Sequence, residues 1–242
     1  MIEVKTKPIA WSRLRIEKVE ATRLTLPELS LYPVGKRLMD VALTTIALIP
    51  LLPIMSLIAL AVKLDSPGPA IFKQKRVGRW GRDFTIYKFR TMRADADDSL
   101  HREFAANYIN GQSSKIGIAA ANGDVVYKPN GDNRITRVGK WLRQTSLDEL
   151  PNLFNVLRGE MSLVGPRPVV RYEVEQYSKW HLGRLAVLPG LTGLPQVSGR
   201  GKLTFKEAVK LDLEYIERRS LLFDLQIILK TFPVFWRTKA TA

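Results

Sequence analysis

The chain has 242 residues, of which 45% are hydrophobic, enough for one packed domain with an appendage. It has no cysteine, which excludes a disulfide framework, a zinc–thiolate site and a cysteine nucleophile. Its net charge of +15 indicates anionic partners: nucleic acid, an anionic membrane or phosphorylated substrates.

Residues 1–35 are predicted to be an N-terminal extension, because charged and apolar side chains alternate there without a clear period. We expect no secretory signal in this segment. The apolar run that follows comes too late in the chain, and no small-residue cleavage site comes after it.

Residues 36–64 are predicted to form a membrane helix. Val41 to Val62 carries no charge and is about as long as the ~20 residues that cross a bilayer. Pro50 and Pro53 lie in its middle, where each removes a backbone hydrogen bond. Basic residues on both sides of the run favour the cytoplasmic face. We therefore predict a re-entrant hairpin, broken at the prolines, with a buried core helix as the alternative.

Residues 65–242 are predicted to form a compact, mainly helical α+β domain on the cytoplasmic side. Two short strands are expected at Ala70–Phe72 and Phe84–Tyr87, joined by a glycine-bearing turn. Helices are expected over Val138–Thr145, Asn152–Arg158, Leu203–Arg219 and Leu221–Trp236. The last helix ends in tryptophan and basic residues, which favour a membrane surface, although ordinary core packing is the alternative.

Asp148 and Glu149 are the leading candidates for chemistry, because the chain has neither cysteine nor a convincing histidine base. Both precede Pro151, and proline fits best as the first residue of a helix. The pair would then lie just before a helix N-terminus, where free amides and the dipole favour a phosphate. Sharing Mg²⁺ with a diphosphate would relieve their mutual repulsion. The alternative is a capping box between Ser146 and Glu149.

Several cations stand in or beside loops rich in glycine and proline. Arg167 lies between two prolines on a stiff backbone, and its guanidinium suits phosphate oxygens; a purely structural turn is the alternative. Lys88 and Arg90 follow the second predicted strand, and Arg200 ends a third such loop. The acidic residues Asp95, Asp97 and Asp98 lack the spacing of a calcium loop, so a solvated helix start is the favoured interpretation.

Ordered sequence blocks between Lys36 and Thr231 connect the chain to a known family. The blocks include Asp65-Ser66-Pro67-Gly68-Pro69, Lys88-Phe89-Arg90-Thr91-Met92, Ser146-Leu147-Asp148-Glu149-Leu150-Pro151, Gly165-Pro166-Arg167-Pro168 and Pro189-Gly190-Leu191-Thr192-Gly193. In these blocks the chain resembles the polyprenyl-phosphate hexose-1-phosphate transferases, or monotopic phosphoglycosyl transferases. It departs from some members at the membrane break, where Leu52-Pro53 replaces Ser-Pro and Pro50 is extra.

The resemblance implies that a sugar-1-phosphate moves from a UDP-sugar to polyprenyl phosphate with release of UMP, at the bacterial inner membrane. Asp148 would be the nucleophile that carries the phosphosugar, and Glu149 would help it hold Mg²⁺. Phosphate or nucleotide would be handled by Lys88, Arg143, Arg167 and Arg200. Arg90, in the second of these blocks, and Gln196, shortly after the last, complete the substrate-binding candidates.

Two other functions stay open on the sequence: a basic membrane scaffold and a nucleic-acid-binding protein. The long uncharged run and the glycine–proline loops do not favour nucleic acid, so we expect no such partner. The sequence does not predict which sugar is moved or which glycan is built, and it leaves the oligomeric state open, with a homodimer as one option.

Overall fold

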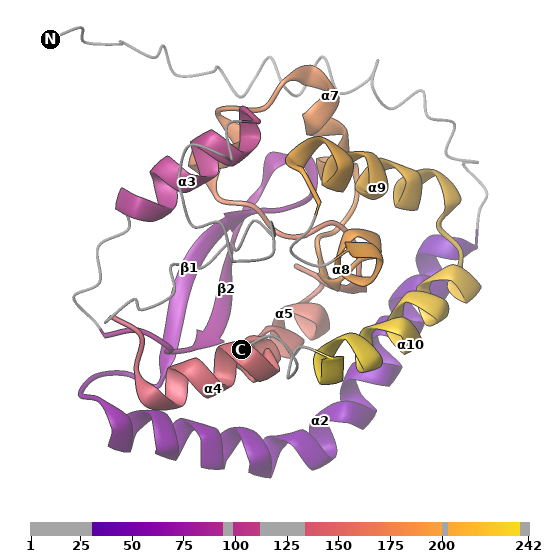
Figure 1. Ribbon diagram of the computed structural model, residues 1–242. Coiled ribbons are helices and arrows are strands. Elements are labelled where there is room, and N and C mark those ends of the chain that lie inside the picture. Colours follow the sequence, from indigo (N-terminus) through magenta and orange to yellow (C-terminus); the bar gives the residue numbers. More distant parts are fainter. Residues whose placement is uncertain (1–30, 94–98, 112–133, 200–202, 238–242) are drawn as a thin grey trace, which may run out of the picture. The chain divides into compact units, whose positions relative to one another are not determined.

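The computed structural model describes residues 31–93, 99–111, 134–199 and 203–237 (Figure 1). The extension up to residue 30, the acidic residues Asp95, Asp97 and Asp98, and the candidate Arg200 lie outside these ranges. The described part of the chain is mostly helical with a few short strands, which confirms this much of the predicted fold class.

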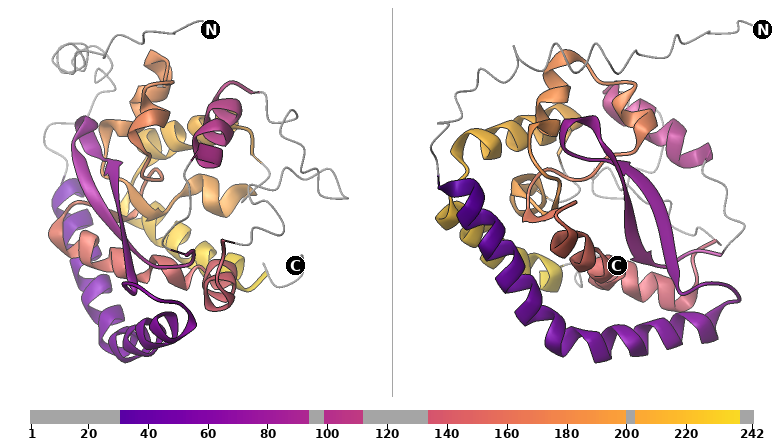
Figure 2. Two further views of the ribbon diagram at one scale, coloured as in Figure 1. Left: turned by 90° about the vertical axis from the view of Figure 1, so that its left-hand side faces the viewer. Right: turned by 180° about the vertical axis from the view of Figure 1, so that it is seen from behind.

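The predicted membrane segment is one helix, α2, of 34 residues (Tyr32–Asp65), and it begins at Tyr32 rather than at residue 36. The backbone stays helical across Pro50 and Pro53, so two separate arms joined by a non-helical break are not observed. The ribbon nevertheless bends midway (Figures 1 and 2). Proline explains a bend in this part of the helix, because each one removes an i to i−4 hydrogen bond.

One side of α2 packs against the rest of the domain and the other is exposed and apolar. Leu48, Met55, Ile58 and Val62 are buried, while ten large apolar residues from Leu31 to Leu64 are exposed. The most apolar window of the helix is 22% buried, and among the described residues α2 is the helix long and apolar enough to cross a membrane. So low a buried share argues against the alternative of a core helix.

A two-stranded antiparallel hairpin follows α2. Strand β1 (Ile71–Val77) pairs with β2 (Asp83–Phe89) from Ile71 opposite Phe89 to Val77 opposite Asp83. Both strands have seven residues and are longer than predicted. The charged residues in β1 after Phe72 obscure the alternation of apolar and polar residues that marks a strand. A single turn of 3-10 helix, η1 (Arg79–Gly81), joins them where the glycine-bearing turn was expected.

Most of the remaining elements are short, apart from α9 and α10, and the predicted helices appear among them. They are α3 (Ser99–Ile109), α4 (Arg137–Thr145), η3 (Leu147–Asn152), α5 (Leu153–Arg158), β3 (Ser162–Val164), α6 (Arg171–Val174), α7 (Lys179–Leu182), η4 (Gly183–Ala186), β4 (Gly190–Thr192), α8 (Leu194–Gly199), α9 (Phe205–Arg218) and α10 (Leu221–Arg237). Gly159, with φ of 76°, follows the last residue of α5 and closes the helix. β3 and β4 pair in parallel, which was not predicted.

The inner side of α2 forms a core with the elements that carry the candidate site. Its buried residues cluster with Phe89 of β2, Leu142 of α4 and Leu153 of α5. A second cluster joins β3, α9 and α10 around Val164, Tyr215 and Ile227. The inner side of α2 is therefore packed into the domain that carries the candidate site, while its other side stays exposed.

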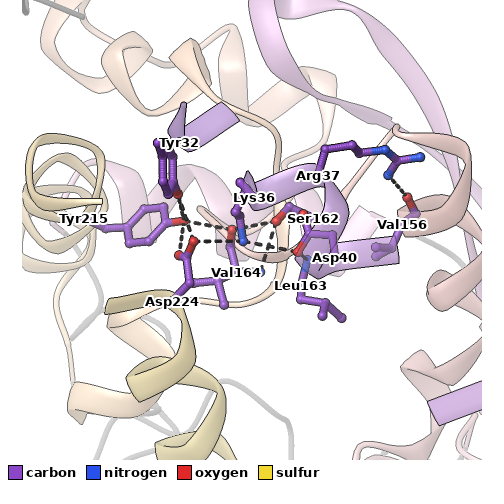
Figure 3. A network of polar contacts seen from close by, with 10 residues as sticks. All are labelled: Tyr32, Lys36, Arg37, Asp40, Val156, Ser162, Leu163, Val164, Tyr215 and Asp224. Atoms are coloured by element: carbon purple, nitrogen blue, oxygen red, sulfur yellow. Dashed lines mark hydrogen bonds and ion pairs between the residues drawn. The ribbon is translucent and has the colours of Figure 1, made fainter. Parts of the chain in front are cut away.

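The N-terminal arm of α2 is fastened by buried polar contacts (Figure 3). Lys36 Nζ lies 3.2 Å from a carboxylate oxygen of both Asp40 and Asp224, and Asp40 Oδ1 accepts a 3.1 Å hydrogen bond from the amide of Leu163. Arg37 donates to the Val156 carbonyl at 2.5 Å. These contacts link α2 to α10, β3 and the end of α5.

Candidate active site

Asp148 and Glu149 lie in the first turn of η3. The prediction of a helix that begins at Pro151 is wrong, because the 3-10 turn already begins at Leu147. Pro151 lies inside this turn, and α5 starts after it, at Leu153. A residue without an N–H interrupts the hydrogen-bond pattern, which separates the 3-10 turn from the α-helix.

The capping box that the sequence left as the alternative does not form at this turn. Ser146 has a left-handed backbone, with φ of 57°, and its side chain makes no capping hydrogen bond. Its carbonyl accepts a 3.2 Å bond from the amide of Glu149. The left-handed residue turns the chain between α4 and η3, and so presents the two carboxylates at the start of a new helical segment.

Strand β2 contacts η3, the turn that carries Asp148 and Glu149 and is called the carboxylate turn below. Lys88 Nζ lies 2.5 Å from Glu149 Oε1, so the structure brings these two predicted site residues together. The amide of Tyr87 donates to Asn152 Oδ1 at 2.9 Å, and Asn155 Nδ2 donates to the Thr85 carbonyl at 2.7 Å. Asn152 and Asn155 are buried, and they pair backbone groups of β2 that would otherwise be unsatisfied.

Two further cations, Arg76 and Arg167, lie near this turn. Arg76 of β1 donates to Gln74 Oε1 at 2.6 Å and to the Pro168 carbonyl at 3.4 Å, while its buried Nε has no hydrogen-bond partner. Burial and, to a smaller extent, repulsion from Arg167 lower the pKa of Arg76 to about 10, against the opposing effects of Glu173, Tyr172 and Glu149. Arg76 therefore lies within electrostatic reach of both Arg167 and Glu149.

Glycine contacts between two loops position Arg167. The amide of Gly165 donates to the Thr192 carbonyl and the amide of Gly190 donates to the Pro166 carbonyl, both at 2.9 Å. A Cβ atom added to Gly190 would overlap the backbone of Gly165. The glycines permit this close approach of backbones, so the loops form one rigid support that leaves Arg167 exposed at its surface.

Three further candidates have different surroundings. Arg143 Nε, in the last turn of α4, donates to Thr91 Oγ1 at 2.9 Å. Gln196 lies on α8, and its Oε1 is buried without a hydrogen-bond partner. Arg90 is 5% exposed and donates at 2.6 Å to the carbonyl of Ser66, just past the end of α2. The position of Arg90 favours a role in closing α2 over the predicted contact with substrate.

The donor set suits Mg²⁺ only together with a substrate. The described residues contain no cluster of three His, Cys, Asp or Glu residues that could hold a metal by itself. Mg²⁺ is commonly bound by one or two carboxylates together with substrate phosphates and water. Adjacent carboxylates at Asp148 and Glu149, with cations nearby for phosphate, fit that pattern.

Residues 31–238 match the model of a family described as bacterial sugar transferase. The chain belongs to the bacterial sugar transferase family. The match covers α2 and every element after it, including η3 with its two carboxylates. Family membership confirms the resemblance proposed from the sequence and places the chain among transferase enzymes.

Curated relatives of this sugar transferase carry names that describe related activities. The exopolysaccharide production protein ExoY of Sinorhizobium fredii is 40% identical over 207 residues, which cover 84% of this chain and 88% of the relative. The UDP-glucose:undecaprenyl-phosphate glucose-1-phosphate transferase of Xanthomonas campestris is 42% identical over 208 residues, 83% of this chain and 38% of the relative.

The undecaprenyl-phosphate galactose phosphotransferase of Salmonella typhimurium is 42% identical over 202 residues, 84% of this chain and 40% of the relative. The chain thus spans about two fifths of two of these relatives and most of the third.

Arg76 is the site residue that the sequence did not single out. In the sequence it is one of several cations that follow the predicted strand Ala70–Phe72, and nothing in that pattern distinguishes it from Lys73 or Lys75, which are exposed. Its partial burial within electrostatic reach of Arg167 is a tertiary property. The available signal was the family resemblance, which includes Phe72, Gln74 and Arg76 as well.

Proposed function

We propose that this sugar transferase moves a sugar-1-phosphate from a UDP-sugar to a polyprenyl phosphate such as undecaprenyl phosphate, through an intermediate on Asp148. The observation that carries the proposal is the juxtaposition of Asp148 and Glu149 on η3 with Lys88, beside Arg76 and Arg167. The names of the relatives agree with a sugar-phosphate donor and an undecaprenyl phosphate acceptor.

The reaction is balanced as two displacements at phosphorus. A carboxylate oxygen of Asp148 attacks the β-phosphorus of the UDP-sugar, the bond from that phosphorus to the bridging oxygen breaks, and UMP leaves with the electron pair. A phosphate oxygen of the acceptor then attacks the same phosphorus. The aspartyl–phosphorus bond breaks, which releases the lipid diphosphosugar and restores the carboxylate.

The side chains around Asp148 would organise the phosphates. Lys88 fixes Glu149 by their ion pair, and Arg76 and Arg167 would neutralise the charge that builds up on the diphosphate. Bound Mg²⁺, held by Asp148 and Glu149, would supply Lewis-acid stabilisation of the departing phosphate. Gln196 has an unpaired buried oxygen that suits a hydroxyl or N–H of the donor.

We also propose that the protein lies in the bacterial inner membrane with its catalytic domain in the cytoplasm. The exposed apolar side of α2 supports a site in the bilayer, and Leu222, Leu225 and Leu229 of α10 form a further exposed apolar stripe. The basic composition suits an anionic membrane surface. A location at the bilayer also suits an acceptor with a long hydrocarbon chain.

The decisive test is detection of the covalent intermediate. Purified protein in detergent, given a UDP-sugar without acceptor, should gain the mass of a phosphosugar and release one equivalent of UMP. Asp148→Asn should show neither, because an amide is a far poorer nucleophile toward phosphorus. Turnover by Asp148→Asn at the wild-type rate would reject Asp148 as the nucleophile.

A further inference from the structure

An apolar groove of about 550 Å³ lies between the C-terminal half of α2 and the helix α4. It is lined by Ile54, Leu57, Ile58 and Ala61 of α2 and by Arg137, Val138 and Trp141 of α4. The α2 residues have the spacing of a single helical stripe, so the groove runs along the helix. Figures 1 and 2 show the two helices side by side.

Two large apolar residues that line this groove are exposed, one from each helix. Leu57 is 67% exposed and Trp141 is 50% exposed. Apolar surface gathered in a concave site is a signature of a ligand or a lipid, because water gains little there from hydrogen bonding. An occupant with a hydrocarbon chain would bury this surface.

The basic residues along α4 indicate that the occupant also has an anionic group. Arg137 lies in the groove, and Lys140 and Arg143 follow on the same helix. The helix leads from the groove to the carboxylate turn: at about 1.5 Å per residue, Trp141 is only ~6 Å along the axis from the last helical residue, Thr145. A ligand with an anionic head group on an apolar chain would match the apolar groove with its chain and the basic residues of α4 with its head group.

We propose that the groove binds the first isoprene units of the polyprenyl phosphate acceptor and directs its phosphate along α4 toward Asp148. This assignment rests on the proposed function. It names the acceptor rather than a bilayer phospholipid because the groove leads to the reacting carboxylate, which the acceptor phosphate has to reach and a structural lipid does not.

Filling the groove should weaken the acceptor half-reaction alone. Ala61→Trp places an indole in the groove, and Trp141→Ala removes one of its walls. Each should raise the KM for polyprenyl phosphate about tenfold or more, as expected from the loss of a few hydrocarbon contacts. Formation of the phosphosugar adduct from UDP-sugar without acceptor should keep its wild-type rate and extent.

The matched control is Leu60→Trp, because Leu60 is exposed on the same helix and does not line the groove. Its acceptor KM should stay at the wild-type value. Wild type should prefer a long polyprenyl phosphate over a phosphate with one isoprene unit, and both groove variants should reduce this preference. If Ala61→Trp does not fold, as judged by thermal unfolding, the exposed Trp141→Ala decides.

Three results would overturn the assignment: an unchanged acceptor KM in the groove variants, an equal rise in Leu60→Trp, or competition by excess phosphatidylglycerol in wild type that the groove variants lose. The last would identify ordinary phospholipid as the occupant. Failure of the proposed function looks different, because wild type would then form no adduct and release no UMP.

Discussion

Glu149 is held by Lys88 at 2.5 Å, so its carboxylate is fixed before any metal binds. If Glu149 and Asp148 hold Mg²⁺ with the donor diphosphate, EDTA should abolish UMP release and added Mg²⁺ should restore it. Glu149→Gln should lose about 100-fold in rate, since it removes a charge from the metal site. The control is Glu175→Gln, at an exposed glutamate of the surface, which should keep wild-type activity. Full activity in EDTA would remove the metal from the mechanism.

Arg76 and Arg167 repel each other in the absence of an anion, and a diphosphate between or beside them would relieve this repulsion. Arg76→Gln should therefore raise the KM for the UDP-sugar by about 10- to 100-fold, the range of a lost charge-assisted hydrogen bond. Arg79→Gln, at an exposed arginine of the hairpin turn, is the matched control. A lowered kcat with unchanged KM and unchanged inhibition by UDP would assign Arg76 to fold support alone.

The substitution Arg167→Lys tests whether the planar guanidinium is needed in addition to its positive charge. The prolines on both sides fix its backbone, so its guanidinium fork is presented with little entropy to lose. Arg167→Lys keeps the positive charge but cannot bind two phosphate oxygens in one plane. We expect a KM for UDP-sugar at least about tenfold higher, measured by UMP release. Wild-type kinetics would make the residue peripheral.

The candidate cations also show which property of a single residue the sequence does not predict. Composition and loop context mark a cation as a candidate, but they do not say which way its side chain points. Arg90 and Lys88 are two residues apart, yet Lys88 reaches the carboxylate turn and Arg90 the end of α2. Arg76 became a candidate only because folding partly buries it within electrostatic reach of Arg167.

At the scale of elements, the fastening of α2 rests on buried charges. Asp224 of α10 is fully buried and pairs with Lys36, so Asp224→Asn should leave this ammonium with Asp40 but without Asp224. A buried charge left without any partner costs about 3–5 kcal/mol, so the loss here should be smaller than that. We expect a clearly lower Tm in detergent than for Glu214→Gln, which breaks an exposed pair with Arg218. Equal Tm values would show that this network contributes little.

Sequence patterns predicted the elements that have a period of their own. The helices α4, α5, α9 and α10 and the β1–β2 hairpin lie where the pattern placed them. β3 and β4 were missed because each has three residues, too few for a period, and they pair across a long stretch of chain. The start of η3 was missed because the position of Pro151 was interpreted for an α-helix and not for a 3-10 turn.

The whole molecule constrains how α2 can sit in a bilayer. At about 1.5 Å per residue its 34 residues extend ~51 Å, well beyond a hydrocarbon core of about 30 Å. Both of its ends are bonded to the same domain: Arg37 donates to the Val156 carbonyl of α5, and Asp65 accepts from the amide of Val138 on α4. A helix that crossed the membrane would place these two attachment points on opposite sides of it.

We therefore predict that α2 enters and leaves the bilayer through the cytoplasmic face, with its bend at Pro50 and Pro53 inside. The basic N-terminal segment agrees with this topology, since cytoplasmic segments near a membrane helix carry the excess of Lys and Arg. Single cysteines can be introduced at Lys7 and at Thr241 of this cysteine-free chain. In intact cells, or spheroplasts where an outer membrane is present, neither should react with an impermeant maleimide, and both should react after lysis. Labelling of the N-terminal site alone in intact cells would establish a true membrane span, and the contacts at both ends of α2 could then not coexist in the membrane-bound protein.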